Sequence, residues 1–354
     1  MTFLSGRLRF ASAFFCAMFA FHVAAQQVDN PGQTPMKDTE AVAQSGPAVQ
    51  DHVENPSNTP LNFALVGQQH VDNPGQTPPS DAAPLGEAVV TGNGINYNGG
   101  PVLKGNPVPF YLIWYGNWNS TGSNTAATQT LVEHFVSTLG GTPYELVATT
   151  YGDNTGNASG NVSLGGAINV FSSTNLSDAS LQTTVSNALN SGALPRDSNG
   201  IYFVISSSNI NETSGFCTKY CGFHTHATIN SVDIKYAFIG NPDRCPSGCE
   251  AQTTGPNSPS VGSGGADGII FQLAGRQFDS ITDPDLNAWF DSSGREAVEK
   301  CASLMIPGTL CTASTCSPAG VSGRAKENVC FGGHCWFLPE LWENANGGKC
   351  VLHL

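Results

Sequence analysis

In the last two thirds of the chain, continuous hydrophobic runs alternate with segments whose hydrophobic residues recur every three or four positions. Three short runs predict strands buried on both faces, at residues 108–114 (VPFYLIW), 200–206 (GIYFVIS) and 236–240 (YAFIG). Residues 145–150 are predicted as a further strand. Residues 152–165, rich in Gly and Asn, are predicted as turns and a short strand.

Three other segments repeat their hydrophobic residues every three or four positions, which predicts amphipathic helices at residues 126–139, 178–190 and 267–284. Because strands and helices alternate, we expect an α/β or α+β fold, in which helices cover a central sheet within one large domain. The segment after Cys301 is rich in cysteine and irregular, with a strand or turn at residues 336–342.

The third helix has an unusual middle. Its hydrophobic positions follow the helical period: Ile270, Leu273, Ala274, Phe278 and Ile281. Gly275 and Arg276 interrupt this pattern, and a mid-helix Gly costs ~1 kcal/mol relative to Ala. Pro284 ends the helix. The interruption at Gly275 and Arg276 makes the middle of this helix a candidate functional segment.

Residues 1–25 resemble a secretory signal. Arg7 and Arg9 precede a hydrophobic run at 10–20, and Val-Ala-Ala before Gln26 is a small-residue cleavage site. The run is too short to span a bilayer, and no later segment approaches 18 continuous hydrophobic residues. We expect a secreted, extracellular mature chain without a membrane span; an uncleaved anchor is the alternative.

Residues 26–90 contain a repeated motif: VDNPGQTP at 28–35 and 71–78, and VENPSNTP at 53–60. The segment is rich in Pro, Gln and Asn and poor in aromatic residues, so it cannot bury enough surface to order itself. We expect a disordered spacer before a folded domain at residues 91–354. The alternative is a set of linear motifs that bind a partner or carry sugar.

Cysteine usage agrees with export. Cys16 lies in the signal, and the ten others are disulfide candidates: Cys217, Cys221, Cys245, Cys249, Cys301, Cys311, Cys316, Cys330, Cys335 and Cys350. Spacing does not fix their connectivity, although we favour pairing of the first four among themselves. The alternative for those four is a four-thiolate zinc site.

The charge balance excludes two classes of partner. The formal net charge is −13, and 12% of residues are charged. Nucleic-acid binding requires a basic face, and adhesion to anionic membranes requires clustered Lys and Arg. We expect neither.

Several blocks carry a family resemblance and follow one order along the chain: GGPV from Gly99, YLIWYGNW from Tyr111, NGIYFVISS from Asn199, FCTKYCGFH from Phe216, YAFIGNPDRCPSGC from Tyr236, GADGII from Gly265 and DPDLNAWF from Asp283. Together they resemble the phosphate-induced protein 1 and EXORDIUM-like family over residues 97–301. The resemblance implies an extracellular or cell-wall protein, linked in plants to growth and nutrient response. We expect it to be non-catalytic, without a cofactor, and to bind a wall polysaccharide or a surface protein.

The resemblance also bears on the third helix. Family members carry a His-Glu-Leu-Ala-Glu-like run there, which resembles a zincin helix that supplies a metal ligand and a general base. Gly275 falls where the His would be, Arg276 where the Glu would be, and Asp279 at the second acidic position. Gly offers no ligand atom and Arg repels a divalent metal. We expect a relic site, whose remaining candidates are Asp279, Glu296, Glu299 and Asp267.

His224 and His226 suggest an alternative. Two positions apart on a predicted strand, they would point to one face, where they could bind zinc together with Glu296. The chain would then be a zincin-like metal-dependent hydrolase with non-standard ligands. The simpler interpretation is a pair of polar residues beside a disulfide cluster.

Three further predictions concern single side chains. Asp267 is expected to be the N-cap of the third helix rather than a catalytic residue. Arg276 is expected to pair with Asp279 or Asp283. Aromatic rings at Trp114, Tyr115 and Trp118 could form a platform for glycan contact, or they could be core residues.

Overall fold

The computed structural model describes residues 93–259, 262, 264–302 and 306–354. The predicted signal at 1–25 and the predicted spacer at 26–90 lie outside this range. Among the described residues, no helix has the length and hydrophobicity needed to cross a bilayer.

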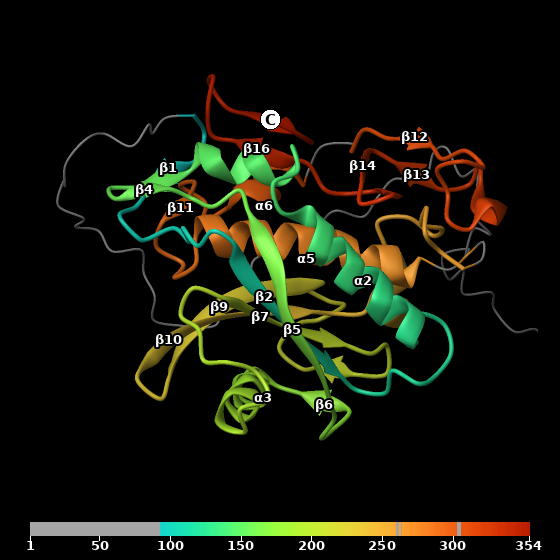
Figure 1. Ribbon diagram of the computed structural model, residues 1–354, viewed down its shortest axis with the longest axis horizontal. Coiled ribbons are helices and arrows are strands. Elements are labelled where there is room, and N and C mark those ends of the chain that lie inside the picture. Colours follow the sequence, from blue (N-terminus) through green and yellow to red (C-terminus); the bar gives the residue numbers. More distant parts are fainter. Residues whose placement is uncertain (1–92, 260–261, 263, 303–305) are drawn as a thin grey trace, which may run out of the picture. The chain divides into compact units, whose positions relative to one another are not determined.

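A five-stranded sheet forms the centre of the described part of the chain (Figure 1). Its strands, in spatial order, are β5 (Val162–Val170), β2 (Val108–Tyr115), β7 (Ile201–Ser206), β10 (Val232–Ile239) and β9 (Gly222–Ile229). The first four are mutually parallel, and β9 pairs antiparallel with β10 in a hairpin. The three predicted strands are thus confirmed as β2, β7 and β10.

Helices cover both faces of this sheet, which confirms the predicted α/β architecture. Helices α2 (Ala126–Leu139) and α5 (Gly265–Thr282) pack on one face, and α3 (Asp178–Asn190) packs on the other. Alternate side chains of β2 enter the two hydrophobic cores, so that Phe110 faces α2 and α5 while Tyr111 faces α3. Burial on both faces explains why these strands read as continuous hydrophobic runs.

Two sequence predictions in this region were wrong. Glu145–Thr150 is a 3-10 helix, η1, rather than a strand. The Thr149 and Thr150 hydroxyls donate to backbone carbonyls three residues earlier and close the turns. Strand β5 is longer than expected and extends to Val170. Gly165 is an extra residue opposite β2, and it interrupts the alternation that would mark a strand.

The remaining elements are short. The strands are β1 (Asn96–Tyr97), β3 (Gly152–Asp153), β4 (Gly156–Asn157), β6 (Asn175–Leu176), β8 (Asn211–Glu212), β11 (Trp289–Phe290), β12 (Thr309–Leu310), β13 (Lys326–Glu327), β14 (Val329–Phe331), β15 (His334–Trp336), β16 (Leu341–Glu343) and β17 (Lys349–Val351). The helices are η2 (Pro242–Arg244), α4 (Pro246–Cys249), α6 (Ala297–Cys301) and η3 (Ala319–Val321).

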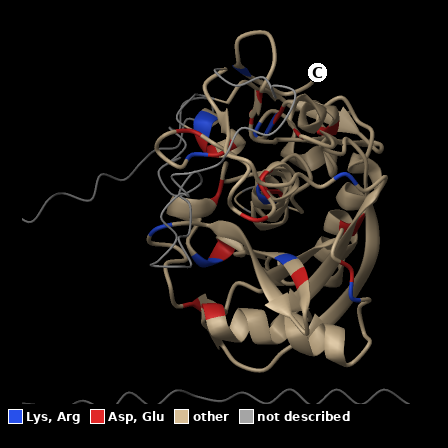
Figure 2. Cartoon of the chain, turned by 90° about the vertical axis from the view of Figure 1, so that its left-hand side faces the viewer, with Lys and Arg blue, Asp and Glu red and all other residues tan. Residues whose placement is uncertain are grey.

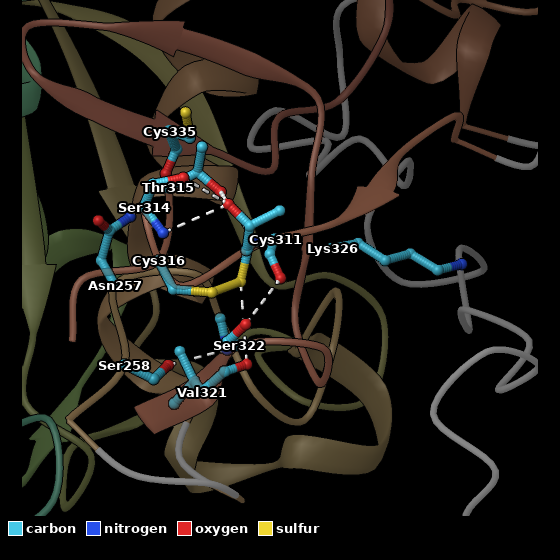
Figure 3. The surroundings of a disulfide bond; sticks show 12 residues. Asn257, Ser258, Cys311, Ser314, Thr315, Cys316, Val321, Ser322, Lys326 and Cys335 are labelled. Atoms are coloured by element: carbon cyan, nitrogen blue, oxygen red, sulfur yellow. Dashed lines mark hydrogen bonds between the residues drawn. A yellow bond between two sulfur atoms is a disulfide. The ribbon is translucent and has the colours of Figure 1, made fainter. Parts of the chain in front are cut away.

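All ten cysteines outside the predicted signal form disulfides: Cys217–Cys245, Cys221–Cys249, Cys301–Cys350, Cys311–Cys316 and Cys330–Cys335. The first four pair among themselves, as favoured, so their sulfurs are not free thiolates for zinc. Figure 3 shows the small loop that Cys311–Cys316 closes. The next residue, Ser317, donates its N–H to Pro256 O at 2.8 Å, which joins this loop to the segment before α5.

A buried acid connects η1 with α5. Gln277 Nε2 donates to Glu145 Oε2 at 2.9 Å, and both side chains are fully buried. Burial raises the pKa of Glu145 to about 8, and the Gln277 hydrogen bond lowers it only in part. The folded protein therefore holds a proton on Glu145 at neutral pH, whereas the unfolded chain does not.

This proton makes a pH-dependent contribution to stability. The contribution is fully present below the ordinary pKa of 4.5 and is lost as the pH rises through about 8. Replacing Glu145 by Gln keeps the shape of the group and removes the titration. We expect Glu145→Gln to match the wild type near pH 4.5 and to exceed it at pH 9, on the order of 5 kcal/mol as an upper bound. Urea unfolding at both pH values measures this, and a difference independent of pH would contradict it.

Candidate functional site in the middle of helix α5

Helix α5 lies in the interior of the fold, between the sheet and the segment that contains α6 and β16 (Figure 1). All 18 of its residues are buried. Buried polar side chains lose contact with water and must find partners inside the protein. The partners of Arg276 and Asp279 therefore define what the middle of this helix can do.

Arg276 is the cation at the centre of the site. Only 12% of the residues of the chain are charged, and Figure 2 shows where those of the described residues lie. Its Nη1 lies 2.6 Å from Glu299 Oε1 and 3.3 Å from Asp279 Oδ2. The predicted pairing with Asp279 is confirmed, whereas the strongest contact, with Glu299, was not anticipated. Burial opposes the charge of Arg276, but the Glu299 and Asp279 carboxylates outweigh this effect and raise its pKa further.

The short helix α6 brings the second and third acids to α5. Glu296 caps α6, and its own N–H donates to Glu299 Oε2 at 3.1 Å in a capping box. The Val298 N–H donates to Asp279 Oδ1 at 3.3 Å. Glu299 and Asp279 thus serve two purposes, because they contact Arg276 and also accept the otherwise unpaired N–H groups at the start of α6.

His224 of β9 completes the cluster from the side of the sheet. Its Nε2 lies 3.0 Å from each carboxylate oxygen of Glu296, and both side chains are buried. Burial lowers the pKa of His224, which favours the neutral imidazole. Its Nδ1 has no hydrogen-bond partner among the described residues.

Acidic groups outnumber the single guanidinium. Burial raises the pKa of Asp279 well above its ordinary value, Glu299 raises it further, and Arg276 offsets this only in part. Burial likewise raises the pKa of Asp283, with a smaller contribution from Glu296. The cluster therefore favours protons on these two acids instead of a full set of buried negative charges.

The site does not fit a metal ion as it stands. Oxygen atoms of Asp279, Glu296 and Glu299 lie within 4.8 Å of one another, a spacing that a cation could bridge. However, Arg276 Nη1 already contacts two of the three carboxylates. A divalent ion would have to enter beside a permanent positive charge.

The packing around Gly275 also argues against a metal ligand in the middle of α5. A Cβ atom built at this position would lie 3.3 Å from Val298 Cγ1 of α6. An imidazole is much larger than a methyl group, so a histidine would displace α6. The close contact between α5 and α6 thus depends on the hydrogen side chain of Gly275, and the helix has no ligand where the resemblance places one.

Comparison with known proteins agrees with the resemblance. A family model described as the phosphate-induced protein 1 conserved region matches residues 95–351. The chain belongs to this family.

Two relatives from Arabidopsis thaliana have EXORDIUM-like names. The protein EXORDIUM-like 5 is 26% identical over 222 residues, which cover 55% of this chain and 59% of the relative. The protein EXORDIUM-like 3 is 28% identical over 223 residues, which cover 55% of this chain and 64% of the relative. The matched region thus spans about three fifths of each relative. No solved structure matches the chain.

The fold of this family member brings together three of the four predicted relic residues, Asp279, Glu296 and Glu299, but places Asp267 elsewhere. Asp267 is also not the N-cap of α5, because the helix begins at Gly265 and the N-cap is Gly264. Its carboxylate accepts hydrogen bonds from the backbone and side chain of Asn257 and from Ser258. Asp267 therefore fastens a loop to the first turn of the helix.

The two histidines belong to separate clusters. His226 Nδ1 lies 2.9 Å from Asp233 Oδ1 and 3.8 Å from Asp285 Oδ1, whereas His224 contacts Glu296. Lys235 Nζ approaches the same two aspartates, at 2.6 and 3.2 Å. The structure thus does not gather His224, His226 and Glu296 around one position.

The predicted aromatic platform is wrong, because Trp114, Tyr115 and Trp118 are at most 3% exposed. A ring that stacks on a sugar must offer a free face. Trp114 instead packs edge-on against Trp118, with ring centroids 4.8 Å apart, and its indole N–H donates to Glu133. These rings are core residues, which was the alternative interpretation.

One member of the site escaped the sequence analysis. The sequence predicts Asp283 only as a partner for Arg276, but its carboxylate accepts hydrogen bonds from the N–H groups of Asn287 and Ala288 at 2.7 and 2.6 Å. An Asp just before the Pro that ends a helix commonly binds nearby N–H groups in this way. That signal could have identified its role.

Removing the guanidinium should destabilise the fold. We expect Arg276→Met to lower the free energy of unfolding by about 3–5 kcal/mol, because it leaves buried carboxylates without their cation. The double variant Arg276→Met with Glu299→Gln should recover part of this loss, since one of the uncompensated acids is gone. Urea unfolding of both variants measures the difference. A single variant within about 1 kcal/mol of the wild type would contradict a structural role for the pair.

Proposed function

We propose that this chain is a secreted, extracellular or cell-wall-associated protein that binds a wall glycan and is not an enzyme. One observation carries the proposal: the polar groups in the middle of α5 neutralise one another inside the protein. Arg276 is engaged with Glu299 and Asp279, and His224 with Glu296. Groups held in this way are unavailable to a substrate.

Export is supported by the cysteine chemistry. Five disulfides within one chain are typical of proteins that fold in an oxidising compartment. The signal-like pattern at residues 1–25 supports the same conclusion. The Arabidopsis relatives supply a family context but no activity.

The topology suggests where a glycan would bind. From β2 the chain runs through α2 to β5 on one side, and from β5 it returns through α3 to β7 on the other side. The order of the strands therefore reverses between β2 and β7. In open α/β sheets, ligands bind outside the carboxyl ends of the strands at such a point.

The loops at that edge carry suitable side chains. Asn117 and Asn119 follow β2, Asn209 follows β7, and all three are exposed. Behind them, Asn124 Nδ2 donates to Ser208 Oγ at 2.7 Å, which holds the two loops together. Amide groups both donate and accept hydrogen bonds, which matches the hydroxyl groups of a neutral polysaccharide.

Retention on insoluble glycans tests the proposal. We expect the secreted chain to be retained on at least one of cellulose, xylan and chitin. The triple variant Asn117→Ala, Asn119→Ala and Asn209→Ala should lose most of this retention. A matched variant with Asn157→Ala and Asn187→Ala, both exposed away from these loops, should keep it. Absence of wild-type retention on every polysaccharide would count against glycan binding.

A zincin-like hydrolase that uses His224, His226 and Glu296 is the weaker alternative, because His226 lies in a separate cluster with Asp233 and Asp285. It would require stoichiometric zinc in the purified protein and loss of that zinc in His224→Ala. Elemental analysis of both proteins separates the two functions, because a non-catalytic glycan-binding protein needs no metal.

A further inference from the structure

Strand β5 is an open edge of the central sheet. It pairs with β2 on one side, and no other strand of the described residues joins it. Its nine residues, VSLGGAINV, include no charged residue and no proline. Edge strands usually carry a charge or a proline that discourages pairing with another chain. The one protective feature of β5 is the bulge at Gly165, which leaves residues 166–170 regular.

The opposite edge of the same sheet, strand β9, is less suited to pairing with another chain. On β9, His226 lies beside Asp233 and Lys235 of the neighbouring strand β10, in a network of charged and titratable groups. A second chain added there would desolvate these groups. The two edges of one sheet therefore differ in their capacity to accept another strand.

A large exposed ring directly follows the open edge. The Phe171 side chain is 59% exposed, more than the other large hydrophobic side chains that reach the surface among the described residues: Leu146, Leu310 and Leu354. Six residues before it, Gly165 is exposed and offers no side chain. An aromatic ring opposite a glycine on a neighbouring strand covers the bare backbone and stabilises the pairing.

We propose that two copies of this protein associate through β5, which pairs antiparallel with β5 of the other copy around Ile168. In this register residues 166–170 of the two copies pair, and Phe171 of each copy lies beside the Gly165 bulge of the other. Ile168 faces its own counterpart, Val170 faces Gly166, and Ala167 faces Asn169. The two five-stranded sheets then form one continuous sheet across a twofold axis.

Self-complementarity favours a second copy over an unrelated extended peptide. A twofold axis at Ile168 pairs each residue of one copy with the residue equally far on the other side of Ile168 in the second copy. The contact between the ring and the glycine therefore occurs twice. The chain carries a net charge of −13, which would oppose self-association over most of its surface. The uncharged edge allows contact without placing like charges opposite one another. Two copies would also present two glycan sites to one polymer and increase retention.

Sedimentation of the full secreted chain tests this, at concentrations from micromolar to millimolar. We expect a reversible monomer–dimer equilibrium that shifts toward dimer as salt screens the net negative charge. The variant with Ala167→Glu and Asn169→Glu places acids opposite acids, so its dissociation constant should rise by about tenfold or more, since cross-strand pair energies add over two positions.

The matched control replaces one of the two introduced acids by a base. With Ala167→Glu and Asn169→Lys, each acid meets a base from the other copy, so dimerisation should persist at wild-type strength or better. Both positions are exposed, and both variants lose the same hydrogen bond from Gln129 Nε2 to Asn169 Oδ1, so the two variants should have similar unfolding temperatures. A wild type that stays monomeric throughout would overturn the proposal, as would equal dimerisation of the two variants. A single glycan site does not need the dimer, so loss of dimerisation would lower retention without abolishing it.

Discussion

The interior of this protein is organised around one guanidinium. Arg276 has no access to water, so its charge must be balanced by the protein itself, and the balancing groups come from two elements, α5 and α6. This requirement fixes how α6 sits on α5. The Cys301–Cys350 disulfide then ties the end of α6 to the last strand, β17. The position of the C-terminal segment on the α/β core therefore depends on satisfying one buried positive charge.

Much of the fold could be predicted from sequence, because the decisive signals are local. Strands buried on both faces need continuous hydrophobic residues, and β2, β7 and β10 have them. The helical period of α2, α3 and α5 is equally direct. The failures occurred where tertiary contacts override local pattern. Residues 145–150 have strand-like composition but form η1, with Glu145 buried against Gln277. Two glycines concealed the length of β5.

The site was predictable in its members but not in its geometry. Asp279, Glu296 and Glu299 were expected as remnants of a family site, and they do lie together. Their relation to Arg276 could not be predicted, because the position of α6 depends on the whole fold. His224 and His226 do share one strand, but residues from different elements surround each of them. For Trp114 and Tyr115 at the end of β2, and Trp118 just after it, the sequence leaves a glycan platform and a core position open, because sequence alone does not distinguish a core ring from an exposed one.

The contact between Gly275 and Val298 has a consequence for substitutions at this site. Placing a ligand side chain at position 275 of α5 would require a smaller residue on α6, and the guanidinium of Arg276 would also have to be removed. Each of these substitutions alone is damaging, through a clash, a void or an unbalanced charge. No single substitution therefore places a metal ligand on this face of α5, and the packing of α5 against α6 keeps the site occupied by its own ion pair.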